Sequence, residues 1–254
     1  MRLQGKVALV SGSTRGIGRT IAEMFASEGA RVAVTGRTVD RGEKVVRGIR
    51  DAGGEAEFFV LDINEEASVR GVVEATVGRF GGLDTLVNNA APTDVVSSTV
   101  KPLPEYTTQE WERILRGTLT GNVFWSCKHA IPHLAAAGGD IINISSAQAV
   151  IGLTGFSAYG AAKGAINALT PILAVQNAPQ GIRVNTIVVG RVISHRADTG
   201  VGVGSGHLTR LGVPADIAYI ATWLASDESG FVTGSLVTAD GGFTINGDAI
   251  MGGV

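Results

Sequence analysis

Short apolar runs alternate with longer helical stretches along most of this chain, and this alternation constrains its fold more than any other feature. Strands that alternate with helices of this length form βαβ units with right-handed crossovers. The sequence therefore predicts an α/β fold, with a doubly wound parallel sheet of about seven strands and helices on both faces. Strands are expected at 7–11, 31–35, 56–61, 83–87, 140–144, 183–188 and 236–238. Helices are expected at 17–28, 40–52, 65–80, 108–134 and 157–178, with another beginning at Pro214.

The bulk composition narrows the class of protein. The chain has 254 residues and no linker-like break, so one domain over 1–254 is expected. The formal charge is −2, from 21 basic and 23 acidic residues without long runs, which argues against a nucleic-acid partner. Mean hydropathy is +0.24, yet no apolar stretch reaches the roughly 18 residues that span a bilayer. Buried parallel strands account for the positive value, and no membrane partner is expected.

Cysteine usage and the first residues predict a cytoplasmic protein. Cys127 is the only cysteine, so no disulfide can form within the chain. It lies in an apolar helical stretch, where core packing is its expected role. The segment 1–6 leads directly into the first strand and shows no signal-peptide pattern.

A glycine-rich turn separates the first strand from the first helix. It contains Gly12, Gly16 and Gly18 in the spacing G-x-x-x-G-x-G. Glycines at such a turn let the backbone approach a pyrophosphate, which the helix N-terminus then faces. In an open parallel sheet ligands bind beyond the carboxyl ends of the strands, where this turn lies. The sequence predicts a dinucleotide-binding domain of the Rossmann type.

The end of the second strand bears on which dinucleotide is bound. An NAD-binding unit carries Asp or Glu there, which binds the 2′-hydroxyl of the adenine ribose. This chain has Gly36 followed by Arg37, and a second cation, Arg15, lies in the glycine turn. Two cations without a carboxylate suit a 2′-phosphate, so NADP(H) is favoured. NAD stays open as the alternative, because Arg37 can also be an ordinary surface arginine.

Tyr159 and Lys163 stand four residues apart on an expected helix, and Ser146 precedes the tyrosine by thirteen residues. This spacing places the phenol and the ammonium on one helix face. A nearby cation favours the phenolate and brings a tyrosine, whose ordinary pKa is about 10, into range for proton transfer. A hydroxyl such as that of Ser146 can hold the reacting oxygen. Tyr-x-x-x-Lys alone is common on solvated helix faces, and its place after the fifth strand gives it weight.

Together these features resemble the short-chain dehydrogenase/reductase family and, within it, the 3-oxoacyl-acyl-carrier-protein reductases. The resemblance covers nearly the whole chain and consists of several motifs in one order. Beyond the residues above, it rests on Asp62, on 88–91 after the fourth strand, and on the runs 181–185, 210–212, 233–234 and 240–242.

The resemblance implies a role for each motif. Tyr159 is expected to be the general acid or base, and Ser146 to bind the carbonyl oxygen of the substrate. Lys163 is expected to hold the nicotinamide ribose and to lower the pKa of the tyrosine, while hydride moves between the nicotinamide and the substrate carbon. The expected cofactor-binding residues are Gly12, Thr14, Arg15, Gly16, Ile17, Gly18, Arg37, Asp62, Asn89, Ala90, Tyr159, Lys163, Gly190, Val192 and Ser194.

The family usually carries an asparagine in its first long helix that anchors a water of the proton relay, and this chain departs from that pattern. Counting forward from Trp111 places Thr118 at that position, whereas counting back from Pro132 places Leu119 there. The helix is one residue longer between these two landmarks. Asn122 would serve only if the helix register shifted. Thr118 is therefore the candidate for the fourth catalytic position.

The segment expected to cover the substrate is rich in glycine. By the resemblance, 191–210 forms a lid, with an ordinary flexible loop as the alternative. Arg191 and His195, near its start, are candidates for binding an anionic or hydroxylated substrate, and a solvated surface is an equal alternative. The glycine-rich tail, 243–254, is expected to fold over its own pocket or a neighbouring one.

These inferences together predict an NADP(H)-dependent oxidoreductase that interconverts a ketone and a secondary alcohol. One alternative is an NAD-dependent dehydrogenase of a cyclic or polyol alcohol. Another is a non-catalytic dinucleotide-binding sensor or scaffold, against which the retention of Ser146, Tyr159 and Lys163 argues. Related proteins form tetramers through the two long helices, so a homotetramer is expected. No metal is expected, since the helical pair His129 and His133 lacks a third ligand.

Overall fold

Seven parallel strands form one sheet in the order β3-β2-β1-β4-β5-β6-β7. The structure is a computed structural model that describes residues 1–136, 138–193 and 210–246. The chain order reverses between β1 and β4, which is the switch point where ligands bind in open α/β sheets. The predicted α/β class and doubly wound sheet are confirmed. The strands are β1 (Val7–Val10), β2 (Arg31–Gly36), β3 (Glu55–Val60), β4 (Thr85–Asn88), β5 (Asp140–Ser146), β6 (Arg183–Val189) and β7 (Leu236–Ala239).

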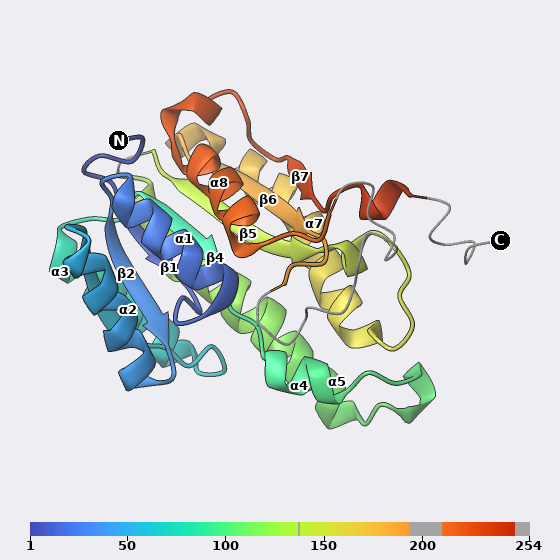
Figure 1. Cartoon of the computed structure of the whole chain (residues 1–254). Helices are drawn as coiled ribbons and strands as arrows, with labels where there is room; N and C mark the ends of the chain where they lie inside the picture. The colour runs from blue at the N-terminus through green and yellow to red at the C-terminus, as the bar shows by residue number, and fades with distance from the viewer. Residues whose placement is uncertain (137, 194–209, 247–254) are drawn as a thin grey trace.

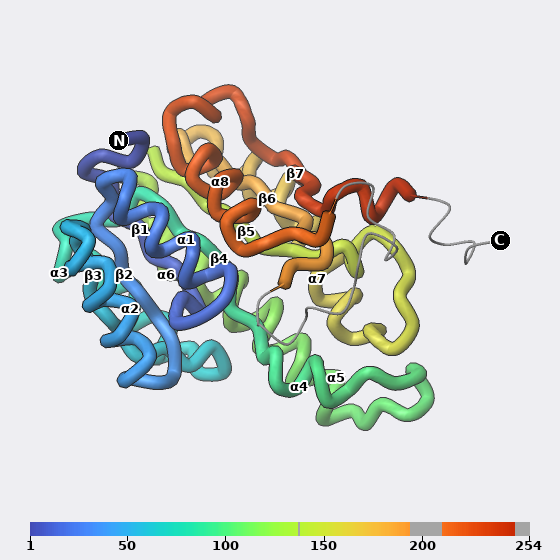
Figure 2. The backbone as a smooth tube through the Cα atoms, in the orientation of Figure 1, coloured from blue at the N-terminus to red at the C-terminus, as the bar shows by residue number. Residues whose placement is uncertain are grey.

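Helices cover both faces of the sheet, and each face has its own apolar core (Figure 1). On one face lie α1 (Gly16–Ser27), α2 (Val39–Asp51) and α8 (Pro214–Ala225). On the other lie α3 (Glu66–Phe80) and α7 (Ser157–Asn177), together with the helix between β4 and β5. Figure 2 follows the chain as it crosses between these layers.

Most element ends differ from the sequence expectation by a residue or two. Strand β5 continues to Ser146, because the ladder with β6 extends to the pair Ser146 and Val189. Helix α7 continues through Pro171 without a break. The catalytic candidate Ser146 lies at the last position of a central strand, where the ladder with β6 holds its backbone.

The prediction of a single α-helix over 108–134 is wrong for residues 116–125. The chain forms α5 (Thr108–Leu115), then a π-helix, η2 (Arg116–Trp125), and then α6 (Ser126–Leu134). π-Helical turns are wider than α-helical ones and occur most often within α-helices at functional sites. The extra residue between Trp111 and Pro132 falls in this stretch, and the wider turns accommodate it without breaking the helix.

A short arm between β4 and α5 has no counterpart among the sequence expectations. It contains α4 (Thr93–Ser98) and the turn η1 (Leu103–Glu105), and it projects from the body beside α5 (Figure 1). Periodicity cannot reveal a helix of six residues in which Val95 alone is buried. The remaining short turns are η3 (Ala147–Ala149), η4 (Ala178–Gln180), η6 (Asp227–Ser229) and η7 (Phe243–Ile245).

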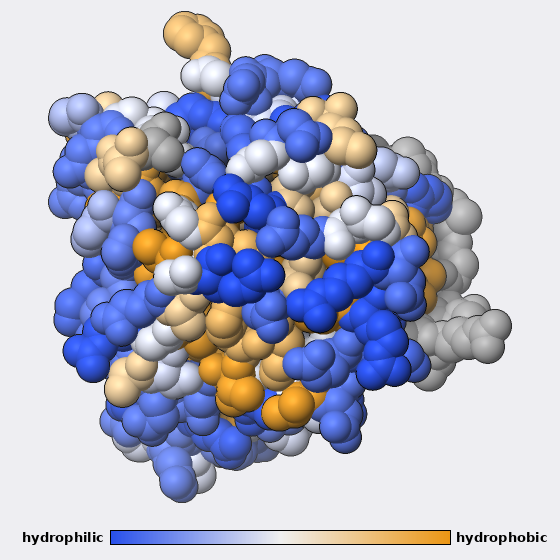
Figure 3. All heavy atoms as spheres, turned by 90° about the vertical axis from the view of Figure 1, so that its left-hand side faces the viewer, coloured by the Kyte–Doolittle hydropathy of each residue, from blue (hydrophilic) through white to orange (hydrophobic). Residues whose placement is uncertain are grey.

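Strand β3 forms one of the two edges of the sheet, and ion pairs cover it. Glu57 of this strand lies 3.1 Å from Arg50 and 3.3 Å from Arg79. Figure 3 turns this side toward the viewer and shows hydrophilic residues interspersed with hydrophobic ones. Charged side chains on an edge strand oppose strand addition by another chain.

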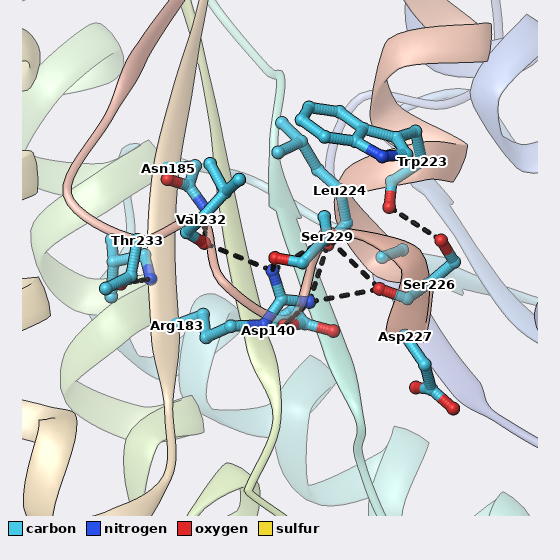
Figure 4. A network of polar contacts seen from close by, with 12 residues as sticks. Asp140, Arg183, Asn185, Trp223, Leu224, Ser226, Asp227, Ser229, Val232 and Thr233 are labelled. Atoms are coloured by element: carbon cyan, nitrogen blue, oxygen red, sulfur yellow. Dashed lines mark hydrogen bonds and ion pairs between the residues drawn. The ribbon is translucent and has the colours of Figure 1, made fainter.

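At the amino ends of β5 and β6, Arg183 organises a dense polar network (Figure 4). Its guanidinium lies 2.6 Å from Asp140 and donates to the carbonyls of Leu224 at 2.9 Å and Ser229 at 2.7 Å. These bonds fasten the end of α8 to the sheet. Of the helices in the described part of the chain, none is both long and apolar enough to cross a bilayer.

Candidate active site

The turn after β1 and the segment after β4 are bound to each other by side-chain hydrogen bonds. The Ser11 hydroxyl accepts the N–H groups of Asn89 at 2.8 Å and Ala90 at 3.0 Å. Asn89 Nδ2 donates back to the carbonyls of Ser11 at 2.9 Å and Gly12 at 3.2 Å. A Cβ added at Gly18 would collide with Asn89 Nδ2, so this glycine is required for the close approach. These bonds and this close contact therefore hold the two loops in a fixed arrangement.

The N-terminus of α1 is free to receive an anion. The helix begins at Gly16, has no acidic residue in its first turn, and has no side-chain cap from Arg15. Its first N–H groups therefore lack a partner that a capping side chain would supply. Gly16 itself has a φ of 54°, a left-handed conformation that favours glycine. This donor set fits the pyrophosphate of a dinucleotide.

Beyond β2, glycine and two arginines define the next part of the site. A Cβ at Gly36 would lie 2.6 Å from Thr14 Cγ2, so Thr14 fills the space in which an acidic side chain would begin. Arg15 donates to Thr93 Oγ1 at 2.6 Å, and Arg37 lies 3.9 Å from Asp94. Both cations that the sequence singled out thus contact adjacent residues of α4.

The three catalytic candidates lie where the end of β5 packs against α7. The ammonium of Lys163, 2% exposed, donates to the carbonyl of Ile144 at 2.6 Å. Ser145 Oγ donates to the backbone carbonyl of Lys163 at 3.2 Å. The Lys163 Nζ lies 5.5 Å from the ring centroid of Tyr159, whose half-buried ring packs among the apolar residues of α4 and α5. The structure therefore brings lysine and tyrosine together beside the strand that carries Ser146.

Burial dominates the protonation of this pair. It raises the pKa of the Tyr159 phenol to about 12 and lowers the pKa of the Lys163 ammonium to about 8. Burial alone accounts for both shifts, so the expected lowering of the tyrosine pKa by the lysine stays a prediction. Tyr159 is therefore a neutral phenol at pH 7, as a general acid must be.

Ser146 has a partner that sequence reasoning missed. Its hydroxyl donates to Gln148 Oε1 and accepts the Gln148 N–H at 3.4 Å. The signal was a polar residue two positions after the serine, where a short 3₁₀ turn follows the strand. Gln148 holds the Ser146 hydroxyl in one orientation.

The missing asparagine of the first long helix is not replaced by Asn122. Asn122 Oδ1 accepts the Ser11 hydroxyl at 2.7 Å, so this side chain reaches the glycine turn. Thr118 is fully buried, and its Oγ1 has no hydrogen-bond partner within the described chain. Asn122 Nδ2 is a second such atom. Buried polar atoms without a partner are rare and are found at functional sites.

The remaining predicted cofactor residues lie along the same edge of the sheet. Asp62 Oδ1 accepts two bonds from Asn64, both at 2.9 Å, which shape the loop after β3. Val192 pairs with Gly212 as an isolated bridge, just beyond β6 and Gly190. Ile17 packs against the core beneath α1. Ser194 lies outside the described residues.

A cavity lies to one side of these groups. It measures about 450 Å³ and is lined by the segment after β6, the end of β7 and the start of α8. Arg191 lines it, whereas Ser146, Tyr159 and Lys163 do not. His195 and most of the expected lid are outside the described ranges. Across those ranges, no three His, Cys, Asp or Glu side chains gather as metal ligands do.

Comparison with known proteins agrees with this geometry. A family model described as enoyl-(acyl carrier protein) reductase matches residues 12–244. The 7alpha-hydroxysteroid dehydrogenase of Clostridium sardiniense is 38% identical over 252 residues, which cover 96% of this chain and 95% of that protein. The NADP-dependent (R)-specific alcohol dehydrogenase of Lentilactobacillus kefiri is 37% identical over 258 residues, covering 96% and 98%. The cis-4-hydroxycyclohexanecarboxylate dehydrogenase of Sinomonas cyclohexanicum is 36% identical over 246 residues, covering 94% and 96%.

A solved structure shows the same fold. The crystal structure of a protein assigned as a short-chain alcohol dehydrogenase from Sinorhizobium meliloti 1021 superposes with a TM-score of 0.87 at 32% identity, covering 96% of this chain and 98% of the other. The chain therefore belongs to the short-chain dehydrogenase/reductase family, as the sequence predicted. It is an oxidoreductase of hydroxyl or carbonyl groups, in a family that uses NAD or NADP.

Proposed function

We propose that this protein is an NADP(H)-dependent oxidoreductase that interconverts a ketone and a secondary alcohol. The observation that carries the cofactor preference is the end of β2, where Thr14 occupies the space beside Gly36 and Arg15 and Arg37 supply positive charge. A carboxylate for a ribose hydroxyl is excluded from position 36, whereas a 2′-phosphate finds two cations. The NADP dependence of the Lentilactobacillus relative supports the same choice.

The residues at the carboxyl end of β5 divide the chemistry among them. When bound, a nicotinamide cofactor supplies or accepts the hydride. Ser146, oriented by Gln148, holds the oxygen of the substrate by a hydrogen bond. Tyr159 donates its phenolic proton to that oxygen in reduction and accepts it in oxidation. Lys163 binds the ribose hydroxyls and, when charged, stabilises the phenolate that proton donation leaves.

Thr118 is the proposed fourth member of the site. Its buried hydroxyl can donate one hydrogen bond and accept two, and none of these bonds is made within the described chain. A hydroxyl with free donor and acceptor positions can pass a proton in either direction. We therefore assign the relay function to Thr118 and not to Asn122, whose acceptor is engaged by Ser11.

Fluorescence titration of the wild-type protein with NADPH and NADH tests the cofactor preference. NADPH is expected to bind more tightly, and Arg37→Ala is expected to weaken NADPH about tenfold while leaving NADH unchanged. Arg47→Ala is the matched control, because Arg47 is exposed on α2, the helix that follows Arg37. Tighter binding of NADH by the wild type would contradict the proposal.

A second candidate is an NAD-dependent dehydrogenase of a cyclic alcohol, and Asp94 is the observation that favours it. Its carboxylate lies beside Arg37, where it could accept a bond from a ribose 2′-hydroxyl. The relatives include dehydrogenases of cis- and trans-4-hydroxycyclohexanecarboxylate. Asp94→Asn separates the candidates: it should tighten NADPH by removing like charge near the phosphate, but it should weaken NADH if Asp94 binds the ribose.

We further propose a homotetramer that buries apolar side chains left exposed on the long helices. Phe124 on η2 is 52% exposed, and Ile172 and Val175 on α7 are 52% and 77% exposed. Apolar side chains grouped on a helix pair are typical of subunit interfaces. Light scattering after size exclusion should give four times the 26.1 kDa chain mass. Val175→Glu should reduce that mass.

A further inference from the structure

The π-helix η2 contains a side chain that reaches out of the helix and into the cofactor loops. Asn122 and Ser11 are both fully buried, and the 2.7 Å bond between them joins positions 111 residues apart in the chain. Neither residue was assigned a role in the reaction above. The bond connects the π-helix to the residue that follows β1.

The Ser11 hydroxyl has its full set of hydrogen bonds. A hydroxyl has one donor and two acceptor positions. The donor goes to Asn122 Oδ1, and the two acceptor positions take the N–H groups of Asn89 and Ala90. Asn122 thereby fixes the direction of the hydroxyl proton, which leaves both lone pairs for the backbone after β4. Without this acceptor the hydroxyl would be free to rotate, and its bonds to that backbone would weaken.

The same π-helix also contacts the loop after β3. Arg116 donates from two guanidinium nitrogens to the carbonyl of Asn64, at 3.1 and 3.0 Å. Gly121 packs directly against the carbonyl of Ile63, where a Cβ would collide. One ten-residue element therefore touches the loops that follow β1, β3 and β4.

We propose that Asn122 is a positioning residue for the cofactor, acting through Ser11 on the loops after β1 and β4. Its contribution is to cofactor affinity and not to proton transfer, which falls to Thr118. The helix that contains Asn122 is one residue longer than the family pattern. In this proposal it lacks the asparagine of the relay and instead carries a side chain that connects the π-helix to the loops after β1 and β4. This inference rests on the proposed cofactor binding at those loops.

A double-mutant cycle on Asn122 and Ser11 tests the link. Asn122→Ala should raise the dissociation constant of the preferred cofactor about two- to tenfold, the range of a single hydrogen bond. In a Ser11→Ala background the same change should add almost nothing, because the bond is already lost. Thr120→Ala, in the same π-helix and half-buried, is the control and should leave the affinity unchanged.

The readouts separate positioning from fold stability and from catalysis. Both NADPH and NADH are titrated, and the pH profile of kcat is recorded for each variant. The profile should keep its wild-type midpoint in Asn122→Ala. Unchanged affinity, with or without a lower Tm, would overturn the proposal. A shifted kcat profile with unchanged affinity would place Asn122 in the relay and would also overturn it.

Two further outcomes keep the inference distinct from the proposed function. Should Asn122→Ala fail to fold, Asn122→Ser is the milder truncation. Ser11→Ala breaks the same bond from the other side, with an expected loss of affinity at least as large, because the bonds to Asn89 and Ala90 are lost with it. A wild type that prefers NADH overturns only the NADP assignment, since the ratio of variant to wild type is then read with NADH. A wild type that binds neither cofactor overturns both proposals.

Discussion

The two ends of the sheet each hold a cation that is largely removed from solvent, and the surroundings of the two cations differ. At the amino end, Arg183 has Asp140 as its counterion and donates to several carbonyls (Figure 4). At the carboxyl end, Lys163 Nζ donates to the carbonyl of Ile144, and no carboxylate lies among its partners in the described part of the chain. Arg183 has a counterion and several acceptors, and these contacts stabilise the fold. Lys163 has no counterion among its described partners, which lowers stability but leaves its ammonium available to a ligand.

The pKa values follow the same division. Burial alone lowers the pKa of Lys163 to about 8. At the other end burial raises the pKa of Asp140 to about 6, and Arg183 and Lys6 oppose that rise. Desolvation therefore moves both pKa values toward neutrality, and at the amino end the neighbouring cations limit the shift. The comparison teaches that incomplete pairing marks the functional end of this molecule.

The largest expected effect is on turnover, from Tyr159→Phe. Loss of a general acid should lower kcat by about 10²–10⁴-fold. The free energy of unfolding should stay within about 0.5 kcal/mol, because no hydrogen bond joins this phenol to another residue in the described ranges. Steady-state rates and urea unfolding measure the two quantities, with the exposed Tyr219→Phe as control. Retained turnover would remove Tyr159 from the chemistry.

Arg183→Met should produce the largest loss of stability, about 3–5 kcal/mol, because it leaves Asp140 buried without its counterion. Urea unfolding measures the loss, and turnover per folded molecule should be unchanged. Adding Asp140→Asn to Arg183→Met should restore part of the stability, because it removes the unpaired negative charge. If Arg183→Met were neutral, the amino end would not be the structural anchor of this comparison.

Lys163→Met should have the opposite sign and stabilise the fold by about 1–3 kcal/mol at pH 7, while abolishing turnover. The folded pKa of about 8 lies below the ordinary value of 10.5, so the unfolded chain binds more protons between these two pH values. The stability of the wild type therefore rises with pH across that window. The gap between variant and wild type should be constant below about pH 8 and close toward pH 10.5.

The smallest effects come from a matched pair of buried hydroxyls. Ser229 Oγ donates to Leu224 and Ser226 and accepts from Arg183, so Ser229→Ala should cost about 1 kcal/mol or more. Thr118 Oγ1 has no such bonds within the described chain, so Thr118→Val should be neutral or stabilising by up to about 1 kcal/mol. Thermal unfolding compares them. Equal losses would mean that Thr118 has a structural partner after all.

Thr118 also has a kinetic test. Thr118→Val should slow turnover if its hydroxyl carries the relay, and Thr118→Asn should hold or raise it. Rates across pH for both variants give the answer. A fall in Thr118→Asn would show that the site has been rebuilt around threonine.

Most of the fold could be predicted because its signals are local. Apolar runs and helical periodicity depend on neighbouring residues. They predicted the seven strands of the sheet, and they placed the glycine turn between the first strand and the first helix. Where signals were short or non-periodic, prediction failed. Helix α4 has six residues, and the π register of η2 changes no residue type, so neither is visible as a pattern.

The sequence by itself determined which residues stand at the carboxyl edge: Tyr159 and Lys163 four apart, Ser146 shortly after an expected strand, and cations without a carboxylate near Gly36. Only the tertiary structure decided their partners. Asn122 finds Ser11, Arg15 finds Thr93, and Ser146 is held by Gln148. Burial, which no local pattern sets, also raises the pKa of the tyrosine. Residue spacing fixes faces of elements, but contacts and desolvation arise only when those faces pack.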